Sequence, residues 1–338
     1  MRRASRCWVL GNLSVVIVKS RLFDSDPGYV SGTKINDCRI STCNSKIQTP
    51  LLMHELYLHP VINLTDRFFS EIGIYFKVLS NVYASRFERK LTNGRTQPCL
   101  ITCDSGGDDI ELIVKVSAGC FEKEKNLIVE AVAAMLAADI GLPVPEPFLV
   151  HLDALFVQSI QDNELRTFLS SASPIAFGSR KLPDGFSVWP SEAVVIESLS
   201  ETAAEVYVFD AIIVNSDRRP VNPNCLFSGR QIGIFDHELA FKQNSVLFWK
   251  EPWVDGGFNG LDDHIFAPRY FEKKVKNLNR FESAWGAITE QRLAEYQQAL
   301  PSEWAGYESF ISETMDYLLQ VKNNISKVVD LGLEKFHE

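Results

Sequence analysis

The sequence predicts an α+β protein with two lobes. Two strand patterns joined by a turn come first, and a helix pattern over 122–140 follows them. The stretch 270–338 is largely helical in pattern. Strands with one helix, followed by a mostly helical half, are typical of an α+β architecture, in which the two kinds of element are segregated.

The first elements are the two strands of a predicted hairpin. The stretches 98–103 and 110–116 are mainly apolar and contain β-branched residues, which favours strands. Between them, 104–109 contains two adjacent glycines and indicates a tight turn. An Asn-Gly turn signal in 91–96 precedes the first strand. We expect a small antiparallel sheet here.

The clearest helix signal lies over 122–140. Apolar residues recur there at helical spacing, and strong helix formers fill its second half. Gly141 is suited to the left-handed residue that ends a helix, and Pro143 prevents its continuation. After it, we expect a strand pair over 147–158 and a connection between the lobes over 170–190.

The second half of the chain is expected to be mainly helical. A long helix is predicted over 191–214, followed by a polar loop over 215–224 and a short hairpin over 225–235. The pattern from 270 onwards adds further helices. We therefore expect an N-lobe over 53–185 and a C-lobe over 186–338.

The stretch 1–52 differs from the rest of the sequence. Its first residues are basic and then apolar, as in a signal peptide, but polar residues interrupt the apolar run. The following stretch is rich in Ser, Asp and Asn and shows no periodicity, whereas a more orderly sequence begins at Met53. We interpret 1–52 as a poorly ordered extension, or as the result of a mis-assigned start, rather than as a targeting segment.

The composition is that of a globular protein. The chain has 338 residues, of which 46% are hydrophobic and 23% charged, and its net charge is −9. This composition excludes a disordered chain, and the acidic balance does not favour direct nucleic-acid binding. No run of eighteen apolar residues indicates a membrane span. The seven cysteines show no metal-site spacing, so we expect reduced thiols in a cytoplasmic protein.

The residues between 215 and 236 carry the strongest indication of chemistry. Asp217 is followed five positions later by Asn222, and Asp236 follows the predicted hairpin. Phosphoryl transfer needs a carboxylate that accepts the proton of the attacking hydroxyl, for which Asp217 is placed. It also needs oxygen ligands for Mg²⁺, which Asn222 and Asp236 can supply. The spacing therefore predicts a phosphoryl-transfer site.

A lysine that binds phosphates is expected upstream of this segment. Lys115 lies at the end of the second predicted strand, and Glu130 lies in the predicted helix. A charged residue within the apolar stretch 127–138 needs a partner, because an unpaired buried charge is costly. We therefore expect Lys115 to pair with Glu130.

Several short motifs resemble the HipA-like kinase domain family, within the protein-kinase-like fold. They occur in the family's order over about 55–270, and the most specific are the Gly-Leu-Pro-Val-Pro and Asn-Pro-Asn strings. The motifs are Gly94-Arg95-Thr96-Gln97-Pro98, Ile113-Val114-Lys115, Glu130, Gly141-Leu142-Pro143-Val144-Pro145, Phe177-Gly178-Ser179, Asp210-Ala211, Asn215-Ser216-Asp217-Arg218, Asn222-Pro223-Asn224 and Asp236-His237.

The resemblance implies a bilobal kinase fold, with a small antiparallel sheet and a helix in the N-lobe and a mainly helical C-lobe. It implies ATP and Mg²⁺ as cofactors and transfer of a phosphoryl group to a Ser/Thr-type hydroxyl. The implied roles are Lys115 on the phosphates, Glu130 as its anchor, Asp217 as base, Asn222 and Asp236 on the metal, and the backbone of Gly94, Arg95 and Thr96 over the phosphates.

The sequence also departs from protein-kinase patterns and leaves alternatives open. It has no G-x-G-x-x-G loop, and Asp236 is followed by His237 and Glu238 rather than by Phe and Gly. A pseudokinase acting through a protein partner and a phosphotransferase for a small metabolite are the alternatives. The substrate is an unidentified hydroxyl compound or protein, and a neutralising partner protein is conceivable.

For three further residues the sequence leaves two roles open. His237 is expected to be a core histidine or one that orients Asp236. Arg218 and Arg219 are expected either to bind a phosphate of the substrate or to form surface ion pairs.

Overall fold

The computed structural model describes residues 78–91, 94–243 and 247–337, together with the backbone of three short strands nearer the N-terminus. The chain divides into two units, Met1–Phe76 and Lys77–Glu338. In the first, β1 (Arg6–Leu10), β2 (Leu13–Ile17) and β3 (Ile40–Thr42) form an antiparallel sheet in that order. The rest of 1–52 lies outside the described residues, and the interpretation of that stretch stays a prediction.

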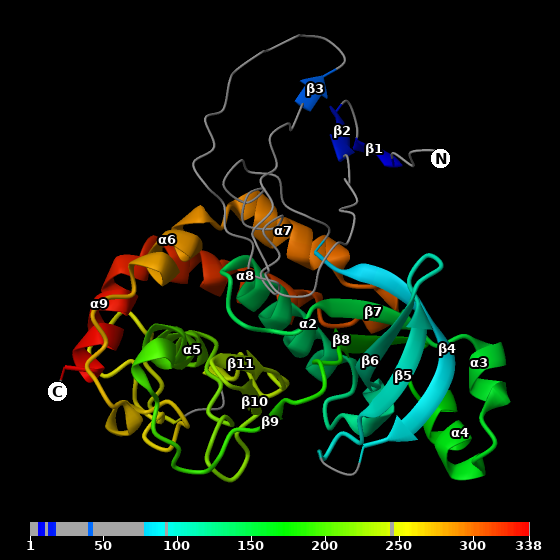
Figure 1. Cartoon of the computed structure of the whole chain (residues 1–338), viewed down its shortest axis with the longest axis horizontal. Helices are drawn as coiled ribbons and strands as arrows, with labels where there is room; N and C mark the ends of the chain where they lie inside the picture. The colour runs from blue at the N-terminus through cyan, green and yellow to red at the C-terminus, as the bar shows by residue number, and fades with distance from the viewer. Residues whose placement is uncertain are drawn as a thin grey trace, which may run out of the picture. The chain divides into compact units, whose positions relative to one another are not determined.

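Five strands of the second unit close into a barrel (Figure 1). The predicted hairpin is confirmed, because β5 pairs with β6 in antiparallel register, with Cys99 opposite Val114. However, β4 and β7 run parallel, so the expectation of a purely antiparallel sheet is wrong. The barrel strands in spatial order are β4 (Ser80–Lys90), β5 (Cys99–Asp104), β6 (Asp109–Lys115), β8 (Ile175–Arg180) and β7 (Pro147–His151).

The predicted strand pair over 147–158 is half right. Its first half is β7, but its second half is the helix α3 (Ala154–Ser159), and α4 (Asn163–Ser170) follows. The carboxylate of Asp153 accepts a hydrogen bond from the Phe156 N–H at 2.7 Å and so caps α3. An Asp in this position satisfies one of the free N–H groups of the first helical turn, which favours a helix over a second strand.

The expected connection over 170–190 contains a barrel strand. Strand β8 pairs with both β6 and β7, so it lies inside the sheet. Gly178 lies where the barrel leaves little room, because a Cβ there would come within 2.6 Å of Val150 Cγ2. The glycine therefore permits close packing and does not mark a loop. After β8, β9 (Ser187–Val188) joins a second sheet with β10 (Cys225–Ser228) and β11 (Gln231–Ile234), which confirms the hairpin predicted over 225–235.

The strongest helix signal corresponds to α2 (Glu124–Asp139). Gly141 follows it in the left-handed region, with φ of 71°, and the Leu142 N–H donates to the Ala137 carbonyl at 2.9 Å. Both features end the helix as expected. Most of α2 is buried, because it belongs to a core that the outer face of the barrel and the later helices share. A second core fills the barrel.

The C-terminal half is helical, as predicted, but its first helix is shorter than expected. Helix α5 (Ser200–Ile212) begins nine residues later than predicted, because Val195 is extended and forms a parallel bridge with Phe271. The following helices are α6 (Asn279–Ala287), α7 (Glu290–Ala299), α8 (Glu308–Asn323) and α9 (Ile325–Lys335). Within the described residues, no helix has the length and apolar character that crossing a membrane requires.

Candidate active site

The predicted contact between Lys115 and Glu130 is present. Lys115 is the last residue of β6 and is 8% exposed, and its Nζ lies 3.0 Å from Glu130 Oε2. Glu130 lies in the buried middle of α2 and is 3% exposed. The pair therefore joins the barrel to the helix at a place with little access to water.

Lys115 also reaches two carboxylates that follow β11. Its Nζ lies 2.6 Å from Asp236 Oδ1 and 3.5 Å from Glu238 Oε2. Asp236 is in the left-handed region with φ of 62°, which a residue other than glycine adopts at some cost in free energy. The backbone at Asp236 thus directs its carboxylate toward an ammonium group from a distant strand.

Burial and charge act in opposite directions on these groups. Burial lowers the pKa of Lys115, but the carboxylates of Asp236, Glu130 and Glu238 outweigh it and hold that pKa well above its ordinary value. Burial likewise raises the pKa of Glu130, but Lys115 and then His237 outweigh it and hold the pKa well below its ordinary value. Both groups are therefore charged near neutral pH.

Glu238 is the exception in this cluster. Burial raises its pKa above the ordinary value of 4.5, and Lys115 opposes the shift less strongly, while Asp236 and Glu130 add to it. The cluster thus holds one ammonium among three carboxylates, and the pKa of Glu238 is shifted in the opposite direction to that of Glu130.

The predicted base lies in the loop between α5 and β10. The Asp217 side chain is 14% exposed, and its Oδ2 accepts a hydrogen bond from Asn222 Nδ2 at 2.8 Å. Its Oδ1 lies 3.2 Å from the Arg219 guanidinium, so Arg219 forms the expected ion pair. Asn222 is therefore held next to Asp217 through its amide N–H, and this hydrogen bond does not use its amide oxygen.

Arg218 forms neither the surface pair nor the phosphate contact that the sequence suggested. It is fully buried, and its Nε lies 2.6 Å from Asp210 Oδ2 in α5. Asp210 also accepts from Asn215 Nδ2 at 2.8 Å and lies 2.9 Å from His264 Nε2. Burial raises the pKa of Asp210, but Arg218 and His264 outweigh it and keep the carboxyl ionised.

Arg218 also connects the two halves of the site. Its Nη1 donates to the Asn224 carbonyl and, at 3.2 Å, to the Phe235 carbonyl. Phe235 directly precedes Asp236, and Arg218 directly follows Asp217. One buried guanidinium therefore fixes the loop that carries Asp217 against the segment that carries Asp236.

His237 contacts Glu130 and not Asp236, so the expectation that it orients Asp236 is wrong. Its backbone N–H donates to Glu130 Oε2 at 2.9 Å, and its Nδ1 lies 3.8 Å from Glu130 Oε1. The expectation of a core histidine is correct, because the residue is 1% exposed. The nearby His237 side chain contributes to holding the pKa of Glu130 below its ordinary value.

The turn that contains Gly94, Arg95 and Thr96 joins β4 to β5. It lies at the same end of the sheet as Lys115, because Cys99 pairs with Val114 and the turn precedes Cys99. Gly94 has φ of 108°, which favours glycine, and the Gln97 N–H donates to its carbonyl at 3.3 Å. Thr96 is buried, and a Cβ on Gly119 would come within 2.1 Å of its carbonyl oxygen. The turn therefore packs closely on the connection between β6 and α2.

The three carboxylates around Lys115 are of the type that binds divalent cations. Ligand oxygens of Glu130, Asp236 and Glu238 lie within 4.8 Å of one another. Carboxylate oxygens are the ligands that Mg²⁺ prefers in proteins. Asp236 is the one predicted metal ligand in this group, and the Lys115 ammonium lies among the same three carboxylates.

Comparison with known proteins decides the family. The sequence matches the model of the family described as HipA-like kinase over residues 85–331. The chain belongs to the HipA-like kinase family. Among solved structures, it is similar to the proinflammatory kinase CtkA of Helicobacter pylori, with 12% identity, a TM-score of 0.40 and coverage of 77% of this chain and 98% of that one. No curated protein matches.

Two residues of this HipA-like kinase escaped the sequence reasoning. Glu238 lies two positions after Asp236, and a second acid so close to a predicted metal ligand was the signal available for it. Asp210 belongs to one of the family motifs, but the local sequence does not indicate which residues pair with it. Its contacts with Arg218 and His264 depend on segments distant in the sequence.

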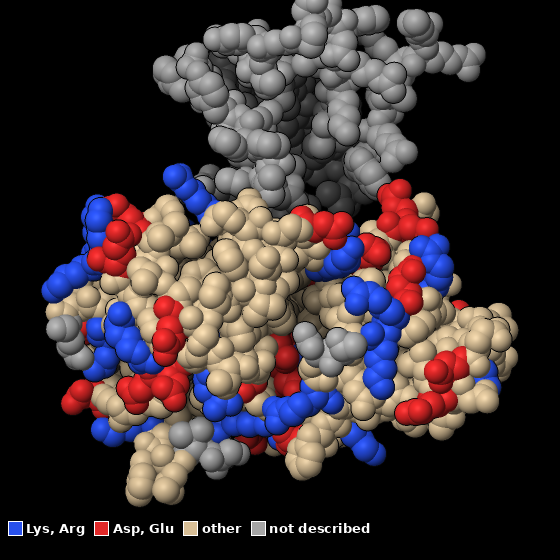
Figure 2. Space-filling view, turned by 60° about the horizontal axis from the view of Figure 1, so that its bottom comes forward, with Lys and Arg blue, Asp and Glu red and all other residues tan. Residues whose placement is uncertain are grey.

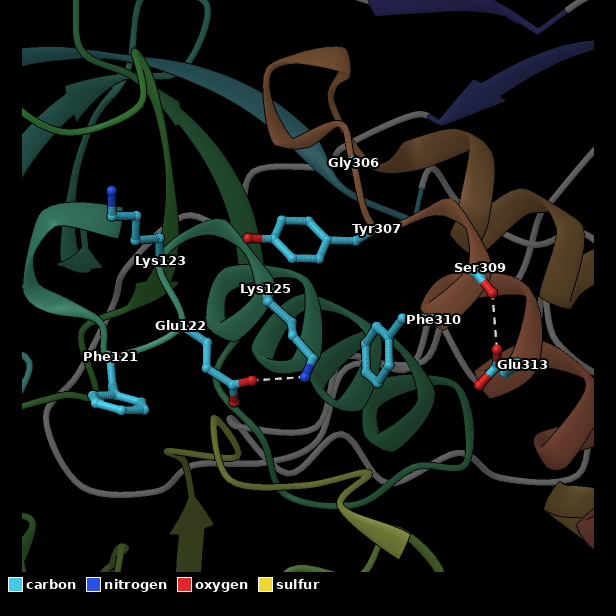
Figure 3. A pocket seen from close by; sticks show the side chains of 9 residues that line it. All are labelled: Phe121, Glu122, Lys123, Lys125, Gly306, Tyr307, Ser309, Phe310 and Glu313. Atoms are coloured by element: carbon cyan, nitrogen blue, oxygen red, sulfur yellow. Dashed lines mark hydrogen bonds and ion pairs between the residues drawn. The ribbon is translucent and has the colours of Figure 1, made fainter. Parts of the chain in front are cut away.

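The surface of the HipA-like kinase shows both signs of charge on the face drawn in Figure 2. Asp and Glu side chains lie in the middle of that face, with Lys and Arg side chains beside them. A separate depression of about 640 Å³ lies at the start of α2 and α8, where Figure 3 shows its lining. It is lined by Phe121, Glu122, Lys123, Lys125, Gly306, Tyr307, Ser309, Phe310 and Glu313. The lining includes none of the predicted site residues.

Proposed function

We propose that this chain is an ATP- and Mg²⁺-dependent kinase that transfers the γ-phosphoryl group to a Ser/Thr-type hydroxyl. The observation that carries the proposal is the meeting of Lys115, Glu130 and Asp236. These residues come from a strand, a helix and a segment more than a hundred positions later. A lysine held by a helix glutamate beside a metal-binding aspartate is the arrangement that kinases use for nucleotide phosphates.

Each residue has a defined role in the proposed reaction. Lys115 binds nucleotide phosphates, and Glu130 holds Lys115 in place. Asp236 and Asn222 supply oxygen ligands for Mg²⁺, which neutralises charge on the phosphates when it is bound. The turn of Gly94, Arg95 and Thr96 covers the phosphates with backbone N–H groups. In this proposal the barrel serves as the N-lobe and the helical half as the C-lobe.

Asp217 acts as the general base. The acceptor hydroxyl oxygen forms a bond to the γ-phosphorus, the bond from that phosphorus to the bridging oxygen of ATP breaks, and ADP leaves with the electron pair. The hydroxyl proton passes to Asp217. Hydrogen bonds from Asn222 and Arg219 orient the Asp217 carboxylate for this step. The acceptor, on a protein or a small molecule, and a neutralising partner protein are part of the proposal, as is a cytoplasmic location.

The test is ATP turnover and self-labelling by the purified chain with Mg²⁺, compared with the Asp217→Ala and Asp236→Ala variants. We expect wild type to consume ATP and each variant to lose about a hundredfold or more of that activity, because each loses the base or a metal ligand. Lys273→Met, which breaks an exposed ion pair with Glu197, is the control and should keep wild-type activity. A wild-type chain that turns over no ATP would contradict the proposal.

A further inference from the structure

The place of α2 decides whether Lys115 meets Glu130. Lys115 belongs to the barrel, whereas Glu130 lies near the middle of α2. A shift of the helix by one turn, about 5.4 Å, would separate the two charges. What holds α2 in place therefore also holds the ion pair.

The C-terminal end of α2 is fixed by a buried ion pair. Arg292 of α7 contacts both carboxylate oxygens of Asp139, with Nε–Oδ2 at 2.5 Å and Nη2–Oδ1 at 2.9 Å. The Tyr296 hydroxyl donates to Asp139 Oδ2 at 2.5 Å. Arg292 is 4% exposed and Tyr296 is fully buried. A two-pronged contact from a planar guanidinium restrains both the position and the direction of Asp139.

A second arginine holds the same end of the helix. Arg280 of α6 donates from Nη1 to the Ile140 carbonyl at 2.9 Å, at the negative end of the helix dipole. Its Nε donates to Glu205 Oε1 in α5 at 2.8 Å. The absence of a side chain on Gly141 leaves room for this contact, because a Cβ there would lie 2.9 Å from Arg280 Nη1. The end of α2 is thus tied to α5, α6 and α7.

The N-terminal end of α2 is held by different residues. Asn126 donates from Nδ2 to the Glu238 carbonyl at 2.9 Å, and its Oδ1 accepts from the Glu122 N–H at 2.7 Å. Lys125 pairs with Glu122 and lies over the ring of Phe310 in α8, 5.0 Å from its centre (Figure 3). Both ends of α2 are therefore fixed to parts of the chain that follow residue 200.

We propose that Arg292 and Arg280 are positioning residues that lock α2 so that Glu130 meets Lys115 in the resting enzyme. The inference rests on the proposed kinase function and adds its regulation to it: this kinase is not switched by moving α2 relative to α5, α6 and α7. A movement of α2 relative to these helices would break the two-pronged ion pair, the Tyr296 hydrogen bond and the contact between Arg280 and the Ile140 carbonyl together. A conformation that lacks all these hydrogen bonds and ion pairs has a higher free energy, so it is sparsely populated.

The test compares Arg292→Met with Arg292→Lys and with Arg180→Met. Arg180 of β8 pairs with Glu146, which directly precedes β7, so it is a control for loss of an arginine ion pair away from α2. We expect Arg292→Met to raise hydrogen exchange of the α2 amides about tenfold or more and to lower kcat about tenfold, with a smaller change in KM for ATP. Arg292→Lys should change α2 exchange and kcat less than Arg292→Met does. Arg180→Met should change neither α2 exchange nor kcat.

The two readouts separate this inference from the kinase proposal. Unchanged α2 exchange in a folded Arg292→Met variant, relative to Arg180→Met, would overturn the positioning role whatever the activity. If wild type shows no ATP turnover, the kinase proposal fails. Hydrogen exchange of the α2 amides still tests whether Arg292 holds the helix in place. Should Arg292→Met not fold, Tyr296→Phe removes only one hydrogen bond. It should raise exchange at the C-terminal end of α2, and unchanged exchange there would also overturn the inference.

Discussion

Lys115 balances three carboxylates in a place from which water is largely excluded. Its contact with Glu130 was predictable because a single acid in an apolar helix needs a partner, and a lysine at the end of the preceding strand is within reach. Its contacts with Asp236 and Glu238 were less predictable. They depend on the path of the chain after β11 and on the left-handed backbone at Asp236, which no local pattern indicates.

Replacing Lys115 by Met should make the protein less stable by about 3–5 kcal/mol at pH 7, because it leaves Glu130 buried without its main partner. The loss should be smaller at pH 5, since an unpaired buried carboxyl takes up a proton more readily. Urea unfolding of both proteins at the two pH values measures this. Lys273→Met, at an exposed pair, should cost less than about 1 kcal/mol at either pH.

The sign of the pH dependence follows from Glu130. Its pKa in the folded protein is below the ordinary value of 4.5, so the stability it contributes is complete above that value and is lost as the pH falls through the folded pKa. The raised pKa of Lys115 acts only in the alkaline range, above its ordinary value of 10.5. A Lys115→Met variant whose deficit is the same at pH 7 and pH 5 would contradict this account of the pair.

Among the elements, α2 and the β5–β6 hairpin were predictable, whereas β8 and α3 were not. The first two carry local signals, namely helical periodicity with Gly141 at the end and a turn between apolar strands. Strand β8 contains a glycine and follows a proline, which are signals of a loop when read locally. Its place was decided by the barrel, where Gly178 packs on Val150.

The turn that contains Thr96 depends on Gly119. A Gly119→Ala change would place a Cβ 2.1 Å from the Thr96 carbonyl oxygen, so the turn or the connection to α2 must move. We expect a loss of stability of about 1–3 kcal/mol and weaker ATP binding. Gly286→Ala in α6 is the control, because its Cβ meets open space. That change should raise stability by up to about 1 kcal/mol.

Calorimetric titration with Mg·ATP and thermal unfolding measure these two effects. If Gly119→Ala binds and unfolds like Gly286→Ala, the turn has room to adjust and its proposed place over the phosphates loses support.

At the scale of the whole molecule, the candidate site is assembled from segments that the fold brings together. The barrel supplies Lys115, α2 supplies Glu130, and the segment after β11 supplies Asp236. The order of these residues was readable from the sequence, and so was the α+β class. The closure of the sheet into a barrel and the burial of Arg218 against Asp210 were not, because each depends on residues distant in the sequence.

The central claim is that Lys115, Glu130 and Asp236 form a site for Mg·ATP. Calorimetric titration of ATP into wild type, Asp236→Asn and Asp217→Asn, each with Mg²⁺ and with EDTA, tests it most directly. Asn suits position 236, because it tolerates a left-handed backbone. We predict Mg²⁺-dependent binding by wild type, at least about tenfold weaker binding by Asp236→Asn, and binding within about threefold of wild type for Asp217→Asn. Binding by wild type that is independent of Mg²⁺ and unchanged in Asp236→Asn would contradict the claim.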